Sequence, residues 1–203
     1  MNKSYLVLLT IMFVMNILSQ NTNMNSKKEL ATFGGGCFWC TEAIFQELEG
    51  VYSVEVGYAG GQTINPSYEA ICTGTTGHAE VIQITYNPEI IAFELLLEVF
   101  FSTHNPTTLN QQGADRGTQY RSVVFYHSLK QKKAANTIIH QLESNKVFST
   151  DIVTEVTAYD VFYKAENYHQ NYYDNNPTNT YCNVVINPKL TKFLKEYKDK
   201  LKK

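Results

Sequence analysis

The chain has 203 residues, 43% of them hydrophobic, which is enough for one well-buried core and too few for two typical domains. Its 17 Lys and Arg and 19 Asp and Glu leave a formal net charge of −2, which excludes the basic composition typical of proteins that bind nucleic acid or anionic membranes. Four unevenly spaced cysteines are too few for a disulfide-dense scaffold and do not repeat as zinc knuckles do. Composition therefore predicts one globular domain with reactive cysteines, and no nucleic acid partner.

The N-terminus has the composition of a targeting segment. Lys3 precedes an apolar run over 5–18, which is shorter than the roughly 20 residues of a membrane-spanning helix. We interpret 1–20 as an export signal, 21–28 as a polar linker and 29–203 as the folded domain. The protein is then exported, periplasmic or anchored facing outside the cytoplasm. An uncleaved anchor stays open because no small-x-small cleavage site follows, and a cytoplasmic location is the alternative.

The remaining sequence alternates between strand and helix patterns. We expect strands over 30–33, 54–58, 80–86, 120–126 and 151–159, and helices over 38–49, 88–101, 128–143 and 190–201. Loop-like segments at 57–61, 73–77, 103–117 and 175–183 can surround the turn before the first helix. The pattern predicts an α+β domain with a mixed sheet.

Cys37 follows three consecutive glycines at the predicted start of a helix. Unpaired N–H groups at a helix start stabilise negative charge, so we predict a lowered pKa and a reactive thiolate. A buried structural cysteine is the ordinary alternative. The Cys37-Phe-Trp-Cys40 spacing is also found in thioredoxin-like dithiols and in half of a zinc site, but no second close pair of ligands follows. We therefore expect a nucleophile and no metal.

Several short blocks, in order along the chain, resemble the motifs of one enzyme family. They are Gly36-Cys-Phe-Trp-Cys40 with Thr41–Phe45, Gly57–Gly61, Tyr68, Gly77–Glu80, Asp115–Tyr120 and His169-Gln170. From about Phe33 to Pro188 the chain resembles A-type peptide methionine sulfoxide reductases. The resemblance implies that family's single-domain, two-layer, ferredoxin-like α+β fold. It also implies reduction of the S epimer of methionine sulfoxide, free or in oxidised proteins, without a cofactor and with electrons from thioredoxin or dithiothreitol.

The same resemblance implies roles for the residues that act on the sulfoxide group. The Cys37 thiolate attacks sulfur while Glu80 protonates the oxygen, which leaves poorly as an anion. Glu80 must then be buried so that its pKa is raised. The hydroxyls of Tyr68 and Tyr120 hold the oxygen, and Asp115 supports the site by hydrogen bonds.

Other residues of these blocks are expected to shape the site. Phe38 and Trp39 resemble the pair that embraces the sulfoxide methyl, where an apolar wall favours an uncharged group over water. His78 and His169 are single histidines of the kind that is more often structural than catalytic. We assign neither histidine a chemical step.

A second thiol must condense with the sulfenic acid that the reaction leaves on Cys37. Cys182 lies in a polar, Asn-rich segment that resembles the family's resolving segment and that we expect to be mobile. Cys40 lies one helical turn from Cys37. We favour Cys182 over Cys40, and a relay through both thiols remains open. Cys72 is excluded because its segment looks like a buried strand.

Two other functions compete with sulfoxide reduction. Disulfide exchange on proteins predicts a proline-containing loop facing the dithiol, which the sequence does not identify. A binding module would use the tyrosines and asparagines of 168–176, but it leaves the Cys37 turn unexplained. A monomer is the default, since no heptad pattern is present.

Overall fold

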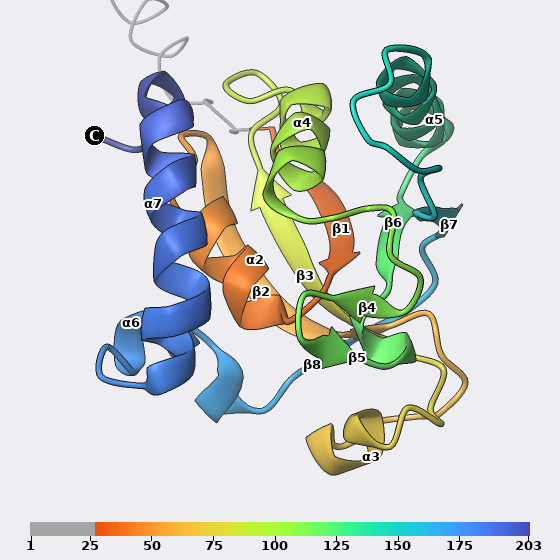
Figure 1. Cartoon of the computed structure of the whole chain (residues 1–203), viewed down its shortest axis with the longest axis vertical. Helices are drawn as coiled ribbons and strands as arrows, with labels where there is room; N and C mark the ends of the chain where they lie inside the picture. The colour runs from red at the N-terminus through yellow and green to blue at the C-terminus, as the bar shows by residue number, and fades with distance from the viewer. Residues whose placement is uncertain (1–26) are drawn as a thin grey trace, which may run out of the picture.

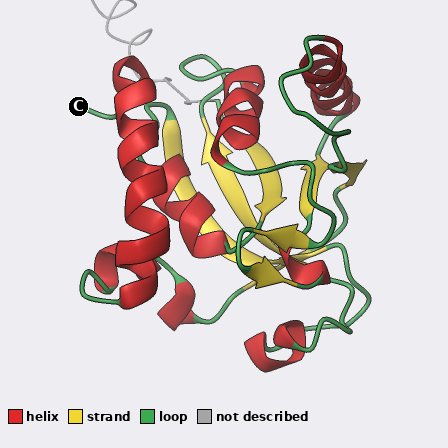
Figure 2. Ribbon diagram, in the orientation of Figure 1, coloured by secondary structure: helices red, strands yellow, loops and turns green. Residues whose placement is uncertain are grey.

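The computed structural model describes residues 27–203 (Figures 1 and 2). The export segment 1–20 and most of the linker lie outside the described residues, and no helix of the described part is both long and apolar enough to cross a membrane. The strands are β1 (Glu29–Gly35), β2 (Val51–Ala59), β3 (Ala79–Tyr86), β4 (Gln111–Gln112), β5 (Asp115–Arg116), β6 (Ser122–Tyr126), β7 (Glu155–Ala158) and β8 (Phe162–Lys164). The α-helices are α2 (Phe38–Phe45), α3 (Tyr68–Cys72), α4 (Phe93–Thr103), α5 (Leu129–Ser144), α6 (Tyr172–Asn175) and α7 (Asn187–Glu196). Shorter turns are the 3-10 helices Thr118–Tyr120, Asn167–His169 and Lys198–Lys200 and the π-helix Cys182–Ile186.

A mixed sheet in the order β7-β6-β1-β3-β2-β8 forms the centre of the domain. All neighbours in it are antiparallel except the parallel pair β6 and β7. Phe33 of β1 pairs with Ile82 of β3, so the end of β1 lies beside the beginning of β3. This register places the turn after β1 next to the first residues of β3.

Helices cover one face of the sheet. Helix α2 packs against β2 and β3 and also contacts α7, while α4 and α5 pack over β1 and over β6 and β7 (Figure 1). Phe33, fully buried, stacks on Phe100 of α4 at 5.0 Å and tilts against Phe45 of α2 at 5.8 Å. A smaller cluster that includes Val81 and Phe125 forms a second, separate core. The predicted mixed, two-layer α+β domain is confirmed.

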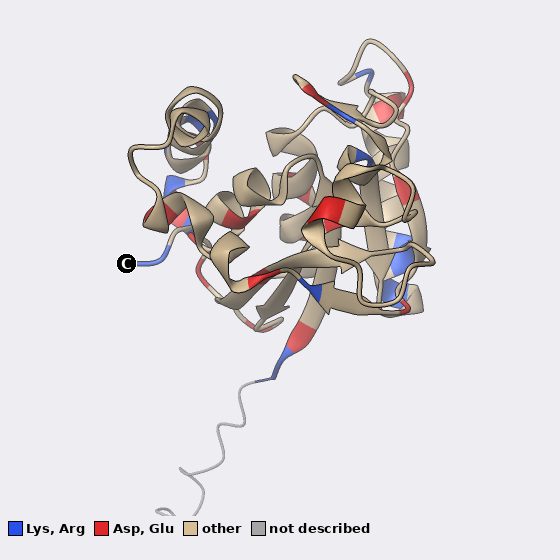
Figure 3. Ribbon diagram, turned by 90° about the horizontal axis from the view of Figure 1, so that it is seen from below, with Lys and Arg blue, Asp and Glu red and all other residues tan. Residues whose placement is uncertain are grey.

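Charged residues are spread over the described chain. Figure 3 shows the Lys, Arg, Asp and Glu residues dispersed over many elements rather than gathered by sign. This dispersion agrees with a formal net charge close to zero.

Helix α4 begins later than the sequence pattern predicts. The side-chain oxygen of Asn87 accepts the N–H of Glu89 at 2.9 Å, and the backbone carbonyl of Asn87 accepts the N–H of Ile91 at 2.9 Å. These bonds close a separate turn after Asn87, so the regular helix begins at Phe93. Asparagine side chains often form such turns in competition with a helix.

The prediction that Cys72 lies in a buried strand is wrong. Cys72 is exposed and ends the short helix α3. Ser67 caps this helix by accepting the N–H of Ala70 at 3.3 Å, which is a common way of satisfying a free donor at a helix start. Tyr120 also differs from its prediction, since it lies in a 3-10 turn before β6 rather than in the strand.

Candidate active site

The turn between β1 and α2 requires glycine at position 36. Gly36 has a φ of +93°, and a Cβ there would lie 2.6 Å from the side chain of Gln112. A side chain at Gly34 would likewise meet the carbonyl oxygen of Glu80 at 3.0 Å. The chain therefore passes close to β3 before Cys37, which takes the N-cap position of α2.

Glu80 is a buried carboxyl group beside this turn. It is the second residue of β3, is 2% exposed and accepts the N–H of Phe38 at 3.1 Å through Oε2. Burial raises the pKa of Glu80 to about 8, although the hydrogen bond from Phe38 opposes the increase. Burial therefore favours the neutral form of this carboxyl group near pH 7, as a proton donor requires.

A cavity of about 170 Å³ opens above Cys37. Its walls bring together segments that are far apart in the sequence, including the first residue of α3 and the first residue of β5. The residues that line the cavity are Cys37, Phe38, Trp39, Tyr68, Glu80, Asp115, Tyr120 and Tyr181. Burial raises the pKa of Tyr68 and of Tyr120, so both hydroxyls stay protonated and can donate hydrogen bonds. The predicted nucleophile, acid, tyrosines and apolar pair thus line one cavity, with Tyr181 added.

The prediction of a lowered pKa for Cys37 is wrong. Burial raises the pKa of the Cys37 thiol well above its ordinary value, and a hydrogen bond with Cys40 and the charge of Glu80 act in the same direction. The hydrogen bond from Cys37 lowers the pKa of Cys40 to about 7. The first proton of this thiol pair therefore leaves near neutral pH.

Tyr181 is a site residue that the sequence analysis did not identify. Its hydroxyl donates to Oδ2 of Asp115 at 2.9 Å and lies 3.8 Å from Sγ of Cys40. It thereby connects a wall of the cavity to the second thiol. The one signal in the sequence was its position directly before Cys182.

Cys182 is itself buried, although much of the polar segment around it is exposed. Its exposed fraction is 0% and it begins the π-helix, where it belongs to the main core together with Ile186. Burial, followed by the charge of Cys40, raises the pKa of Cys182. Cys40 therefore interacts with both Cys37 and Cys182, and all of these thiols are free.

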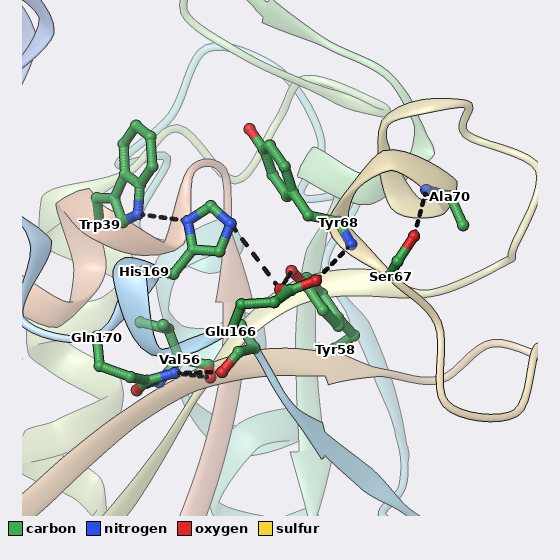
Figure 4. A network of polar contacts seen from close by, with 10 residues as sticks. Trp39, Val56, Tyr58, Ser67, Tyr68, Ala70, Glu166, His169 and Gln170 are labelled. Atoms are coloured by element: carbon green, nitrogen blue, oxygen red, sulfur yellow. Dashed lines mark hydrogen bonds and ion pairs between the residues drawn. The ribbon is translucent and has the colours of Figure 1, made fainter.

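The two histidines of the family blocks are held in hydrogen bonds. His78 accepts the N–H of Gly61 at 3.1 Å and lies 2.8 Å from the carbonyl oxygen of Thr63. His169 accepts the indole N–H of Trp39 at 3.2 Å (Figure 4). Within residues 27–203 no cluster of three or more His, Cys, Asp or Glu side chains could hold a metal ion.

Chemistry in this cavity centres on sulfur. Cys37 lines the cavity beside a neutral carboxyl group, and its thiol lowers the pKa of a second thiol, Cys40, to about 7. A thiol that can be oxidised and then reduced by its neighbour defines a thiol-dependent oxidoreductase. Residues 29–202 match the family described as peptide methionine sulfoxide reductase, and the chain belongs to this family.

Individual relatives agree with this membership. Peptide methionine sulfoxide reductase MsrA of Saccharolobus solfataricus is 52% identical over 174 residues, which cover 86% of this chain and 97% of the relative. The reduced form of Mxr1 from Saccharomyces cerevisiae superposes with a TM-score of 0.72 and 38% identity over 78% of this chain and 91% of that chain. Mxr1 in complex with Trx2 superposes with a TM-score of 0.52 and 29% identity, over 73% and 86% of the two chains. The family and fold predicted from the sequence motifs are both confirmed.

Proposed function

We propose that the protein reduces the S epimer of methionine sulfoxide, free and in oxidised proteins, and so repairs oxidised proteins. The observation that carries this proposal is the cavity in which Cys37 and the neutral Glu80 lie together. Its volume of about 170 Å³ suits a methylsulfinyl group better than a large ligand. Phe38 and Trp39 provide the apolar surface for the methyl group.

The proposed chemistry begins with the Cys37 thiolate. Its sulfur forms a bond to the sulfoxide sulfur while Glu80 gives a proton to the oxygen, and Tyr68 and Tyr120 donate hydrogen bonds to the same oxygen. The hydroxyl then moves to the Cys37 sulfur as the sulfur–oxygen bond of the substrate and the new bond between the two sulfurs both break, and the electron pair of the sulfur–sulfur bond stays on the substrate sulfur. The sulfoxide gains two electrons and leaves as methionine, and Cys37 becomes a sulfenic acid.

Cys40 is the better first partner of the sulfenic acid. The hydrogen bond from Cys37 lowers the pKa of Cys40 to about 7. The charge of Cys40 in turn raises the pKa of Cys182, so these two thiols also interact. Condensation of Cys40 with the sulfenic acid releases water and forms a disulfide, and Cys182 then attacks Cys40 and frees Cys37. The relay through both thiols, left open by the sequence, is thus our proposal.

Trapping the oxidised protein after one turnover tests the relay. We expect mass spectrometry to find a Cys40–Cys182 disulfide in the wild type. In a Cys182→Ser variant we expect a Cys37–Cys40 disulfide, since the second exchange cannot occur. A Cys37–Cys182 disulfide that forms equally well in a Cys40→Ser variant would show that Cys182 attacks directly.

A dithiol reductant completes the cycle by exchange with the final disulfide. Dithiothreitol can serve in vitro, and the complex of Mxr1 with Trx2 supports a thioredoxin-type protein as the natural donor. Each step uses thiols and carboxyl or phenol protons of this chain, so the proposed cycle requires no cofactor. Oxidised proteins and free methionine sulfoxide are the proposed substrates.

The activity is tested with methionine sulfoxide of defined chirality. With dithiothreitol present, we expect the purified protein to convert the S epimer to methionine and to leave the R epimer unchanged. The expected asymmetry follows from the single arrangement of apolar wall and oxygen donors in the cavity. Absence of turnover with the S epimer would contradict the proposed function.

We also propose that the enzyme works outside the cytoplasm. The support is the lysine and apolar run of 1–20, which have the pattern of an export signal. Fractionation of cells that express the full chain is expected to place it in the exported or membrane fraction, with loss of that location when 1–20 is deleted. Retention of the full chain with cytoplasmic markers would contradict export.

A further inference from the structure

Trp39, one wall of the cavity, is held mainly by the last third of the chain. Its indole Nε1–H donates to Nδ1 of His169 at 3.2 Å. The indole also stacks on Tyr172 with ring centroids 3.6 Å apart and 7° between the planes, and Tyr181 meets it edge on at 5.9 Å. The orientation of this wall therefore depends on contacts from outside helix α2.

His169 must be neutral, with its ring proton on Nε2, to make this contact. An indole N–H can only donate, so Nδ1 must be unprotonated. Nε2 is buried, has no hydrogen-bond partner, and lies 4.0 Å from Oε2 of Glu166. Burial also lowers the pKa of His169, which disfavours the doubly protonated ring. A nearby carboxylate favours the tautomer that carries its proton on the facing nitrogen.

Glu166 connects this histidine to the opposite side of the cavity. Its Oε1 accepts the backbone N–H of Tyr68 at 2.9 Å, and its Oε2 accepts the hydroxyl of Tyr58 at 2.9 Å (Figure 4). The Tyr68 ring lies 4.4 Å from the His169 ring, centroid to centroid. The His169 imidazole thus contacts both Trp39 and Tyr68, while the Glu166 carboxylate holds the backbone of Tyr68.

We propose that His169 is a positioning residue that, oriented by Glu166, fixes the Trp39 indole against the methyl group of the substrate. The identity of the substrate rests on the proposed function, whereas the position of Trp39 rests on the observed contacts. Without an acceptor the indole N–H of the half-buried Trp39 is unpaired, and the indole turns toward water. The cavity then holds a methyl group less well and discriminates less against a larger alkyl group.

Two variants of similar size distinguish the loss of the hydrogen-bond acceptor from the loss of the imidazole ring itself. His169→Asn places an amide oxygen near the position of Nδ1, whereas His169→Leu has no acceptor. We expect His169→Leu to raise KM for the S epimer by ~10-fold with a smaller change in kcat, because a lost wall contact weakens substrate binding. His169→Asn is expected to restore most of this loss. Discrimination between methyl and ethyl sulfoxides should weaken in His169→Leu alone.

Trp39 is the only tryptophan in the chain, so its fluorescence reports its position without any turnover. We expect a red-shifted emission and stronger acrylamide quenching in His169→Leu, and near wild-type behaviour in His169→Asn. Tyr168→Phe is the matched control, because this exposed ring contacts His169 and not the indole N–H. Unchanged emission and KM in His169→Leu, or equal defects in both His169 variants, would overturn the proposal.

The wild-type protein provides a test that does not depend on the folding of a variant. Nitrogen-15 NMR at neutral pH should show an unprotonated Nδ1 and a protonated Nε2 for His169, whose resonances the His169→Asn spectrum identifies. A protonated Nδ1 would overturn the proposal. If the wild type fails to reduce the sulfoxide, the proposed function fails, while the fluorescence and NMR results still decide how Trp39 is held.

Discussion

Replacing Cys37 by serine is expected to lower kcat/KM for the S epimer by at least ~10⁴-fold, because a hydroxyl is a far weaker nucleophile toward sulfur than a thiolate. Cys37 is the thiol that lines the cavity beside Glu80, and Cys40 is not among the residues that line it. Cys40 therefore cannot take over the attack. The measurement is single-turnover release of methionine, which precedes every disulfide step.

Cys72→Ser is the matched control for this substitution. Cys72 is exposed and does not line the cavity, so we expect kcat/KM to stay within about twofold of the wild type, as for most surface changes. The melting temperature of Cys37→Ser should also remain near the wild-type value, because serine has nearly the same size. Substantial single-turnover activity in folded Cys37→Ser would contradict the assignment of the nucleophile.

The sequence predicts the cavity well where local motifs meet through the sheet. Cys37 follows β1 and Glu80 is the second residue of β3, and the antiparallel register of these strands brings them together. Tyr68, Asp115 and Tyr120 lie in separate loops and short turns that converge at the same end of the sheet. Similarity to the family identified these positions, although no single loop predicts where it will pack.

The pKa of Cys37 shows where local reasoning fails. The backbone N–H groups at the start of α2 favour a thiolate on Cys37. Burial and neighbouring groups from other parts of the chain outweigh this effect and raise the pKa. Desolvation depends on tertiary packing, which a sequence pattern does not specify.

The C-terminal contacts were missed for a related reason. The hydrogen bonds from Trp39 to His169 and from Tyr181 to Asp115 join residues separated by 130 and 66 positions. Glu42 is another example, since its buried carboxylate accepts the N–H groups of Asn171 and Tyr172. Such pairs carry no periodic pattern, so only the folded chain shows that the last third of the sequence builds one side of the site.

The dependence of kcat/KM on pH is expected to be a narrow bell. Attack requires one thiolate in the Cys37–Cys40 pair, and its first proton leaves near the Cys40 pKa of about 7. It also requires neutral Glu80, whose pKa is raised to about 8. Activity should therefore rise as pH increases through about 7 and fall as it increases through about 8. Both limbs of the kcat/KM profile report pKa values of the free enzyme. The pKa of the rising limb belongs to the Cys37–Cys40 pair rather than to one sulfur.

Glu80→Gln tests the descending limb. The amide oxygen can still accept the N–H of Phe38, but the side chain can no longer give a proton to the departing oxygen. We expect kcat/KM to fall by about 10²–10⁴-fold, the usual contribution of a general acid. The remaining activity should keep its rise near pH 7 and lose its fall near pH 8, since the group that titrates there is absent. Cys40→Ser should move the rising limb to higher pH in single-turnover measurements, because the thiol with a pKa of about 7 is then absent while burial still raises the pKa of Cys37. A descending limb that persists near pH 8 in Glu80→Gln would assign the acid to another residue.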